Sequence, residues 1–552
     1  MSSMAYNQAA GLSGMLKEGS RHVMDDDPTA GSVTLRNIEA CMQLSRMLRT
    51  SLGPQGRCKL VVNHLERLIV TSDCASILKE VTIEHPAAQL LAEACQKQET
   101  ERGDNTNFVL AFGGEILWQT SQLIAKMTWQ PAPEILAGYQ RALTLVENKL
   151  LPDLVCDGVT DLKDKHQLLK ILQPVLASKQ YGSEQTLAPI VADACLTVMD
   201  AQGKFNAESV RVCKIPGSSV SQSTLLEGYV AMRGLETVVT NATDAKIAVY
   251  ACGFEASSTE AKGTVLMKTA ADLLSYNRTE EAKMEEIVQG IAASGVKVVV
   301  TGGNLSDMAL HFLDRASLIC LRIGSKWELR RLCQAVNATA LVRLGAPTPD
   351  EMGFCESIRT QELGGKTVTV FRSHETKLAT ILLRASTSSV LNDLERAVDD
   401  GVQAVVQAGK DGRLVYGGGA VEMALSMALQ QEASRVPGLE QYSIAAFGKA
   451  LEIVPRTLAE NAGWDAVRVL ADLKASHAQH GTESVCDVGI DIERYGTEND
   501  DTGGTCSMKE RGVLDLMSTK LAALRLAVDA ATTILKIDQI IMSKPAGGPK
   551  PQ

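Results

Sequence analysis

Four short segments of this sequence contain glycine, carboxylate or amide groups, which together are suited to binding phosphate and a divalent cation. They are Leu52-Gly53-Pro54-Gln55-Gly56, Thr71-Ser72-Asp73, Gly103-Asp104-Asn105-Thr106 and Gly417-Gly418-Gly419. Glycine lets backbone N–H groups approach phosphate oxygens closely. Where such a segment opens a helix, the helix N-terminus attracts phosphate, and an aspartate such as Asp104 can hold Mg²⁺. Together the segments predict a phosphate site with a bound metal ion.

Each segment has an ordinary explanation when it is taken alone. A Gly-Asp-x-Thr sequence is more often a helix cap, and a glycine triplet usually forms a turn. An acidic pair such as Asp399-Asp400 normally lies on the solvated face of a helix. The prediction therefore depends on the combination of the segments and on their order along the chain.

A competing phosphate motif is present but fails on inspection. Gly364-Gly365-Lys366-Thr367 resembles the end of a Walker A loop, yet Thr360 stands where the first glycine of that loop belongs. The segment also leads into the strand-like run Val368–Arg372, whereas a Walker A loop leads into a helix. We therefore exclude a P-loop.

The bulk composition narrows the class of protein. The chain has 65 acidic and 55 basic residues and a net charge of -10, which argues against nucleic acid as a partner. It contains no run of about 18 uncharged apolar residues, so we expect no membrane span. The 13 cysteines form no C-x-x-C pair and fit a reducing compartment, so we expect a cytoplasmic protein in which Cys58 and Cys74 are buried.

The two ends of the chain have the periodicity of helices. Apolar spacing and helix-start signals predict helices over the residue ranges 35–50, 86–98, 106–123, 388–408, 420–432, 441–459 and 514–534. Two short apolar runs at 59–63 and 68–71 suit a hairpin.

The middle of the chain has a different pattern. Aliphatic runs at 247–250, 298–301, 318–322 and 340–343 alternate with helical stretches at 306–315 and 326–336, which is typical of an α/β domain. The polar stretch 255–268 looks like an exposed excursion. One helical domain made of both termini, with an α/β domain inserted into it, explains the whole pattern most simply.

In this order along the chain, several motifs resemble those of the group II chaperonins, the family of TRiC/CCT and the thermosome. The resemblance covers nearly the whole chain and is carried by Thr50–Gly56, Thr71–Leu78, Glu84–Ala88, Gly103–Phe108, Glu395–Asp400, Gly417–Glu422 and Gly512–Asp515. Three further stretches are close to one subunit type of the eukaryotic complex, namely Gly11–Gly19, Ser178–Gly182 and Gln539–Pro551.

The resemblance implies a multidomain α and α/β chaperonin fold. The mainly helical equatorial ATPase domain would comprise residues 1–145 and 403–552, with a disordered tail from about 544. The α/β apical substrate domain would comprise 214–367, including a helical protrusion near 255–277 that forms a built-in lid. Segments 146–213 and 368–402 would form a hinge-like intermediate domain.

The resemblance also implies a site for ATP or ADP with Mg²⁺. Asp104 would ligate the metal, Asp400 would orient the attacking water, Asp73 would assist at the γ-phosphate, and Lys179 would sense that phosphate. The other nucleotide-binding residues would be Leu52, Gly53, Pro54, Gly56, Gly103, Asn105, Thr106, Asn107, Gly417, Gly418 and Asp515.

Three departures from the family pattern bear on this site. Asn105 stands in place of a glycine, Asn107-Phe108 in place of two threonines, and Gln55 in place of a lysine. If position 105 requires a positive φ, Asn is the least costly residue there after Gly.

The expected function is that of an ATP-hydrolysing folding subunit in a double ring of paralogous subunits. By resemblance, its clients would be unfolded proteins such as actin and tubulin. One alternative is a structural subunit of the same ring that binds nucleotide and hydrolyses little. Another is a free-standing metabolic ATPase or small-molecule kinase with a compact substrate pocket in the middle domain.

Overall fold

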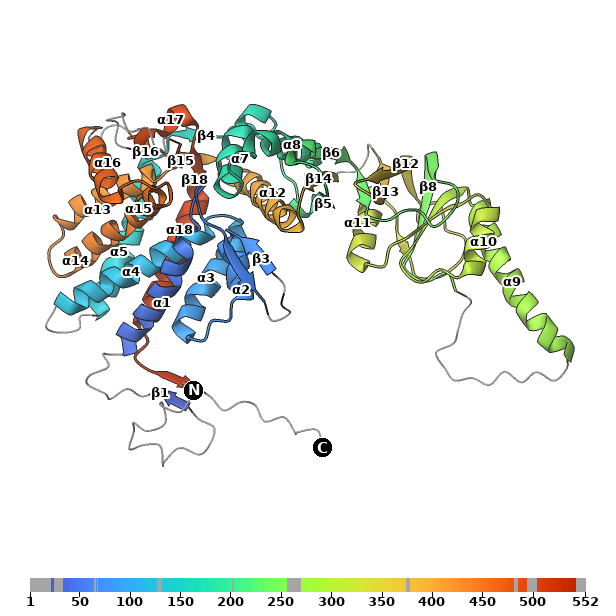
Figure 1. The fold of residues 1–552 in the computed structure, drawn as a ribbon, viewed down its shortest axis with the longest axis horizontal. Coiled ribbons are helices and arrows are strands. Elements are labelled where there is room, and N and C mark those ends of the chain that lie inside the picture. The colour runs from blue at the N-terminus through green and yellow to red at the C-terminus, as the bar shows by residue number, and fades with distance from the viewer. Residues whose placement is uncertain are drawn as a thin grey trace. The chain divides into compact units, whose positions relative to one another are not determined.

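The protein is described here from a computed structural model, which describes residues 21–23, 33–63, 66, 68–126, 132–200, 203–255, 270–373, 378–480, 485–493 and 504–542. The chain divides into two compact units (Figure 1). Unit 1 comprises residues 1–160, 173–181 and 410–552, and unit 2 comprises 161–172 and 182–409.

Unit 1 is built around a helix that is buried along most of its length, α4 (Thr106–Lys126). Helices from both ends of the chain pack against α4, as Figure 1 shows. Phe112 of α4 lies between Phe108 and Phe447, with ring centroids 5.5 and 5.3 Å away. Removing a phenylalanine that is this deeply buried typically costs about 3–5 kcal/mol of stability.

The helices of unit 1 come from the two termini in turn. From the first part of the chain they are α1 (Val33–Arg49), α2 (Cys74–Glu80), α3 (Pro86–Arg102), α5 (Ala132–Leu145), a π-helical turn (Val146–Leu150) and α6 (Leu151–Asp153). From the last part they are α13 (Ala420–Ala433), α14 (Glu440–Leu451), α15 (Ile453–Asn461), α16 (Ala466–His480), α17 (Met508–Arg511) and α18 (Met517–Leu535).

Small sheets complete unit 1 and join distant parts of the chain. Strand β1 (Arg21–Val23) pairs with β19 (Ile540–Met542), β16 (Val488–Ile490) pairs with β17 (Thr505–Ser507), and β2 (Lys59–Val62) forms the expected hairpin with β3 (Leu68–Thr71). The sheet β18 (Leu514–Leu516), β15 (Arg413–Tyr416) and β4 (Asp157–Gly158) is antiparallel throughout. The β1–β19 and β4–β15 pairings join the first part of the chain to the last.

Two of the predicted helices need correction. The segment 441–459 forms two helices that meet at Glu452, because Pro455 has no N–H group and its ring would clash with the carbonyl of Leu451 in a continuous helix. The segment 514–534 begins with β18, because residues 514–516 pair with β15 before the helix starts at Met517.

Cys58 is exposed, contrary to expectation, whereas Cys74 is buried as predicted.

Unit 2 contains a seven-stranded sheet with the order β10-β9-β8-β12-β13-β7, to which β11 adds beside β8. Strands β8 (Asn241–Tyr250), β9 (Val296–Thr301), β10 (Ile319–Arg322) and β11 (Ala340–Leu341) are parallel. Strands β12 (Gly353–Leu363), β13 (Lys366–Arg372) and β7 (Tyr229–Ala231) add antiparallel. The mixed helical and α/β character expected from the sequence is confirmed.

Alternating residues of these strands pack against helices on opposite faces of the sheet. Val249 and Val300 belong to a core shared with α11 (Lys326–Val336). Ala248 and Val299 belong to a core shared with α9 (Ala270–Ala293) and α10 (Asp307–Arg315). Gly364 and Gly365 form the turn between β12 and β13, as expected for a segment that is not a P-loop.

A second, three-stranded sheet in unit 2 has the order β5-β14-β6. It consists of β5 (Val210–Pro216), β14 (Ala379–Ala385) and β6 (Thr224–Glu227), and it contacts α8 (Glu184–Val198) and α12 (Ser388–Ala408). Short 3₁₀ turns occupy Ala207–Ser209 and Val220–Gln222. Helix α7 (Lys165–Lys179) contributes residues to both units.

The predicted domain boundaries remain predictions. The boundary at 367 lies inside β13, which pairs with β12 up to Arg372. Most of the predicted protrusion (256–269) and the tail from 544 lie outside the described residues. Within the described part of the chain, no helix is both long and apolar enough to cross a membrane.

Arg211 joins the two sheets of unit 2. From β5 its guanidinium donates to the carbonyl of Val230 (2.6 Å) and to Glu328 Oε1 on α11 (3.0 Å), and it lies 4.7 Å from the ring centroid of Tyr229. Arg211 is buried, so its loss leaves the Val230 carbonyl without this donor.

We therefore expect Arg211→Met to lower the free energy of opening of β7 and α11 by about 2 kcal/mol, measured by native-state hydrogen exchange. The matched control is Lys165→Met, which removes an exposed ion pair with Asp193 (2.6 Å) and should cost less than about 1 kcal/mol. Unchanged exchange in β7 and α11 of the Arg211 variant would contradict this account.

Candidate functional site

The loop that follows α1 is a tight turn held by its own hydrogen bonds. The N–H of Arg57 donates to the carbonyl of Thr50 (2.8 Å), and the N–H of Gly56 donates to the carbonyl of Gly53 (2.9 Å). Gly53 has φ +80°, and a Cβ there would lie 2.5 Å from Leu458 Cδ2. The backbone angle therefore favours glycine at this position, and an added Cβ would also displace the end of the Leu458 side chain.

Side-chain amides attach this loop to helices from both ends of the chain. Asn107 Nδ2 on α4 donates to the carbonyl of Ser51 (3.0 Å), and Asn461 Nδ2 on α15 donates to the carbonyl of Leu52 (2.9 Å). The loop containing Leu52, Gly53, Pro54 and Gly56 is therefore fixed against the start of α4. The amide N of Asn107, predicted to bind nucleotide, donates within the protein.

The second segment is the corner between α3 and α4. Gly103 ends α3 with φ 76°, and Asn105 follows with φ 66° just before α4 begins at Thr106. Position 105 therefore has a positive φ, the condition under which Asn is the least costly residue there after Gly. Gln98 Nε2 fixes the corner by donating to the Asp104 carbonyl (2.8 Å) and to that of Thr519 on α18 (3.3 Å).

Charged groups from distant parts of the chain affect the pKa of the Asp104 carboxylate. Burial raises its pKa, and the hydrogen bond from the Asn105 N–H (2.6 Å) opposes this. Asp515 raises the pKa further, whereas Lys179 and Lys520 lower it. These electrostatic interactions show that the structure brings Asp104, Asp515 and Lys179 into one neighbourhood.

The surroundings of Asp104 fit Mg²⁺ bound together with a phosphorylated ligand. Among the described residues no cluster of three or more His, Cys, Asp or Glu side chains could hold a metal ion by itself. Mg²⁺ is usually held by one or two carboxylates together with substrate phosphates and water. A cation beside Asp104 would also favour the charged form, which burial disfavours.

Asp73 and Lys179 form an ion pair inside unit 1. Asp73 caps α2 by accepting from the N–H of Ser76 (3.0 Å), and Lys179 Nζ donates to Asp73 Oδ1 (2.6 Å). Burial alone would raise the pKa of Asp73, but the ammonium of Lys179 and the hydrogen bonds from Lys179 and Ser76 outweigh it and lower the pKa to about 2. The carboxylate is therefore charged at neutral pH.

Glu99 is a neighbouring carboxyl group that sequence reasoning missed. Burial raises its pKa to about 7; Asp73 and Asp104 act in the same direction, while Lys179 and Lys79 oppose it. Its Oε2 is buried without a hydrogen-bond partner. The available sequence signal was its position on α3, one helical turn before Gly103.

The glycine triplet lies beside Asp515. Strand pairing places Val415 opposite Asp515, and the N–H of Gly417 donates to the carbonyl of Val513 (3.0 Å). A Cβ at Gly417 would lie 3.0 Å from Asp515 Oδ2, so the absence of a side chain allows this approach. The carbonyl of Gly418 accepts from the N–H of Ile490 (2.9 Å).

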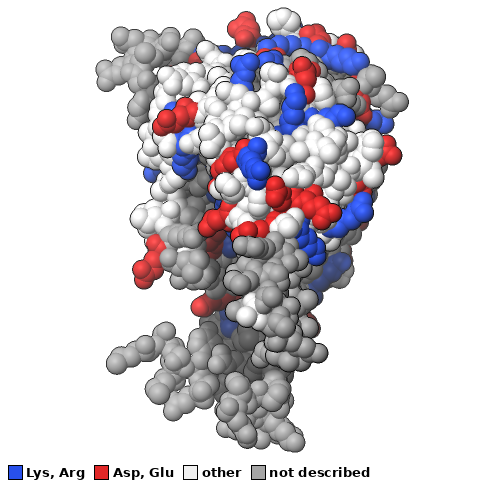
Figure 2. All heavy atoms as spheres, turned by 90° about the vertical axis from the view of Figure 1, so that its right-hand side faces the viewer, with Lys and Arg blue, Asp and Glu red and all other residues white. Residues whose placement is uncertain are grey.

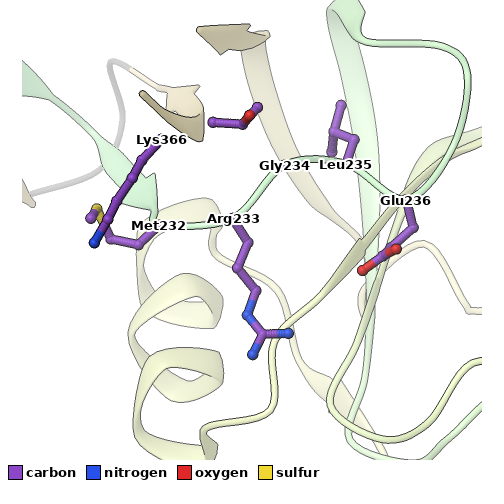
Figure 3. A pocket seen from close by; sticks show the side chains of 7 residues that line it. Met232, Arg233, Gly234, Leu235, Glu236 and Lys366 are labelled. Atoms are coloured by element: carbon purple, nitrogen blue, oxygen red, sulfur yellow. The ribbon is translucent and has the colours of Figure 1, made fainter. Parts of the chain in front are cut away.

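Asp400 belongs to unit 2, where it is buried on α12. Its approach to the residues of unit 1 therefore remains a prediction. A pocket of about 540 Å³, also in unit 2, is lined by Met232, Arg233, Gly234, Leu235, Glu236, Lys366 and Thr367 (Figure 3). None of the predicted nucleotide residues lines it.

The chain is similar to known proteins over nearly its whole length. A family described as the TCP-1/cpn60 chaperonin family matches residues 44–545. The T-complex protein 1 subunits theta of Homo sapiens and Gallus gallus are each 44% identical over 547 residues, which is 99% of this chain and 96% of the relative. The same subunit of Dictyostelium discoideum is 41% identical over 544 residues, which is 98% of both chains. The predicted family and subunit type are confirmed.

The Asp73–Lys179 pair predicts a pH dependence of stability. The pKa of Asp73 is lowered from 3.8 to about 2, so its stabilising contribution is complete above pH 3.8 and is lost as the pH falls towards 2. The excess stability of the wild type over Asp73→Asn should therefore shrink by about 2 kcal/mol over this range, measured by urea unfolding. A difference that is independent of pH would contradict the pairing. In Lys179→Met, which lacks the ammonium that lowers this pKa, the shrinkage should be smaller.

Proposed function

Because this chain belongs to the TCP-1/cpn60 chaperonin family, we propose that it is an ATP-dependent protein-folding subunit of a ring of paralogous chains. ATP or ADP with Mg²⁺ would bind between the loop at Leu52–Gly56, the corner at Gly103–Thr106 and the strand that carries Asp515. Binding and hydrolysis would drive closure of a lid over an unfolded client. We place this activity in the cytoplasm, where thirteen free cysteines would stay reduced.

The observation that carries this proposal is the electrostatic coupling of Asp104 to Asp515, Lys179 and Lys520. These four residues come from α3–α4, β18, α7 and α18, and they meet although more than 400 positions separate the first from the last. Two carboxylates and two ammonium groups beside two glycine-containing turns can hold a metal ion, phosphates and a polar sugar. Fixed charges of this kind supply most of the catalysis of phosphoryl transfer.

Each residue then has a proposed role. Bound Mg²⁺ would neutralise phosphate charge at Asp104, and the free N–H groups at the start of α4 would face the phosphate oxygens. Lys179, held by Asp73 in this structure, would sense the γ-phosphate because a flexible ammonium can exchange one anionic partner for another. Asp400 would orient the attacking water.

A subunit that binds nucleotide but hydrolyses it slowly is the second candidate. The amide N of Asn107 donates to the carbonyl of Ser51, and Phe108 is buried against Phe112. The two family threonines are therefore replaced by residues whose side chains are used for packing and loop support. Gln55 is exposed and carries no charge for the phosphates.

Unit 2 would recognise the client. Trp327 at the start of α11 is 73% exposed, and Lys326, Arg330 and Arg331 are exposed on the same helix. Figure 2 shows basic and acidic side chains interspersed with uncharged ones on the face of unit 2 that it draws. Such a surface suits unfolded chains with mixed polar and apolar segments, such as those of actin and tubulin in the family resemblance.

The hairpin of unit 1 supports assembly with other chains. Leu60 is opposite Val70 and Val62 is opposite Leu68, and all four side chains are exposed. One face of the hairpin is therefore entirely aliphatic, which is unfavourable in water and typical of an interaction site. A neighbouring subunit of the ring would cover it.

The rate of ATP hydrolysis distinguishes an active folding subunit from a subunit that binds nucleotide and hydrolyses it slowly. In assembled rings that carry the change in this subunit alone, we expect Asp104→Ala or Asp400→Ala to lower the single-turnover hydrolysis rate by this subunit at least tenfold, about 1.4 kcal/mol in activation free energy. If nucleotide binds and neither change alters the rate, the slow-hydrolysing structural subunit is the correct reading.

Substitutions on the aliphatic face of the hairpin test whether it takes part in ring assembly. Leu60→Ser combined with Leu68→Ser should weaken incorporation into the ring on the order of 100-fold, because each buried leucine contributes about 1.5–3 kcal/mol. Val467→Ser changes an exposed aliphatic residue on α16 and should assemble normally. A native wild-type particle below several hundred kilodaltons would instead favour a free-standing metabolic ATPase or kinase.

A further inference from the structure

A buried lysine connects the two helices that start beside the candidate nucleotide site. Lys520 lies in the first turns of α18, and Glu422 lies in the first turn of α13. Lys520 Nζ contacts Glu422 Oε1 and lies 3.0 Å from Asp515 Oδ2. The side chains of Lys520, Glu422 and Asp515 are 7%, 2% and 26% exposed, so only Asp515 reaches the surface appreciably.

Lys520 is held in its charged form. Burial lowers its pKa, but the carboxylates of Asp515 and Glu422 outweigh the burial and raise it. Removing three charges from water is costly, and apolar side chains of similar size often pack in such places with no loss of stability. Stability alone therefore does not account for an ammonium at this position.

The arrangement leaves one oxygen of Asp515 available. Asp515 Oδ2 faces Lys520 and the Cα of Gly417, where an added Cβ would come within 3.0 Å. Within the described part of the chain, Oδ1 has no hydrogen-bond partner. An aspartate with one oxygen held by an ammonium presents the other as a fixed acceptor, suited to a neutral hydroxyl donor.

We propose that Lys520, braced by Glu422, is a positioning residue that fixes Asp515 Oδ1 towards a hydroxyl group of the nucleotide sugar. The inference rests on the proposed nucleotide site and specifies how that site selects ribose. The same ammonium also opposes the effect of Asp515 on Asp104, so it allows a second carboxylate close to the metal ligand.

The test is equilibrium binding of ATP, 2′-deoxyATP and 3′-deoxyATP to the full-length chain. The wild type should bind ATP about tenfold more tightly than the analogue that lacks the recognised hydroxyl, as expected for one hydrogen bond to a charged group. Lys520→Met should abolish this preference, so that ATP and that analogue bind with affinities equal to within about twofold, even if the loss of the ammonium weakens both. Lys474→Met removes another lysine that pairs with a buried glutamate in unit 1, Glu452 (2.8 Å), and should keep the preference.

A double variant separates positioning from folding. Lys520→Met leaves Glu422 buried without a counter-ion, whereas Lys520→Met combined with Glu422→Met replaces the pair with apolar side chains. The double variant should match the wild type in thermal stability and still fail to distinguish ATP from the deoxy analogue.

Three outcomes would overturn the inference: a wild type that binds ATP and its analogues equally, a Lys520→Met variant that keeps the preference, or a preference that returns in the stable double variant. A wild type that binds no ATP would instead refute the proposed function.

Discussion

The constraint on which the rest of the structure depends is the burial of α4 among helices from both ends of the chain. Phe112 of α4 packs against Phe447 of α14, and Gln98, just before the α3–α4 corner, is fixed to α18 by a hydrogen bond. Because α4 starts at the Asp104 corner, this core determines where that carboxylate lies. It also keeps the Leu52–Gly56 loop in place through Asn107 and Asn461. The candidate site exists only when the two termini fold as one unit.

The turns of the candidate site, several strands and the fold class could be predicted from local sequence. Glycine requirements are local, and Asn105, which has a positive φ, is one of the few residues other than glycine that tolerate this angle. The hairpin at 59–71 and the strand after Gly365 followed from short aliphatic runs. The mixed fold class followed from the change of periodicity between the ends and the middle.

What could not be predicted depends on contacts between distant segments. A helical pattern over 514–534 does not show that residues 514–516 pair with β15, because pairing energy comes from the partner strand. Glu99 looks like a solvated helix residue from its sequence, but burial in the folded unit raises its pKa, and Asp73 and Asp104 act in the same direction. The Glu422–Lys520 pair joins positions 98 residues apart, and the sequence around each residue contains no signal for it. The site's chemistry is therefore set largely by packing, while its turns are set by residue type.

The most direct measurement of the central claim is a structure of the assembled protein with Mg²⁺ and a non-hydrolysable ATP analogue. We expect phosphates against Gly53 and Gly56, the metal ion on Asp104 and the sugar beside Asp515, with residues of both termini in contact with one ligand. A nucleotide bound elsewhere, for example in the pocket that contains Arg233 and Lys366, would contradict the claim.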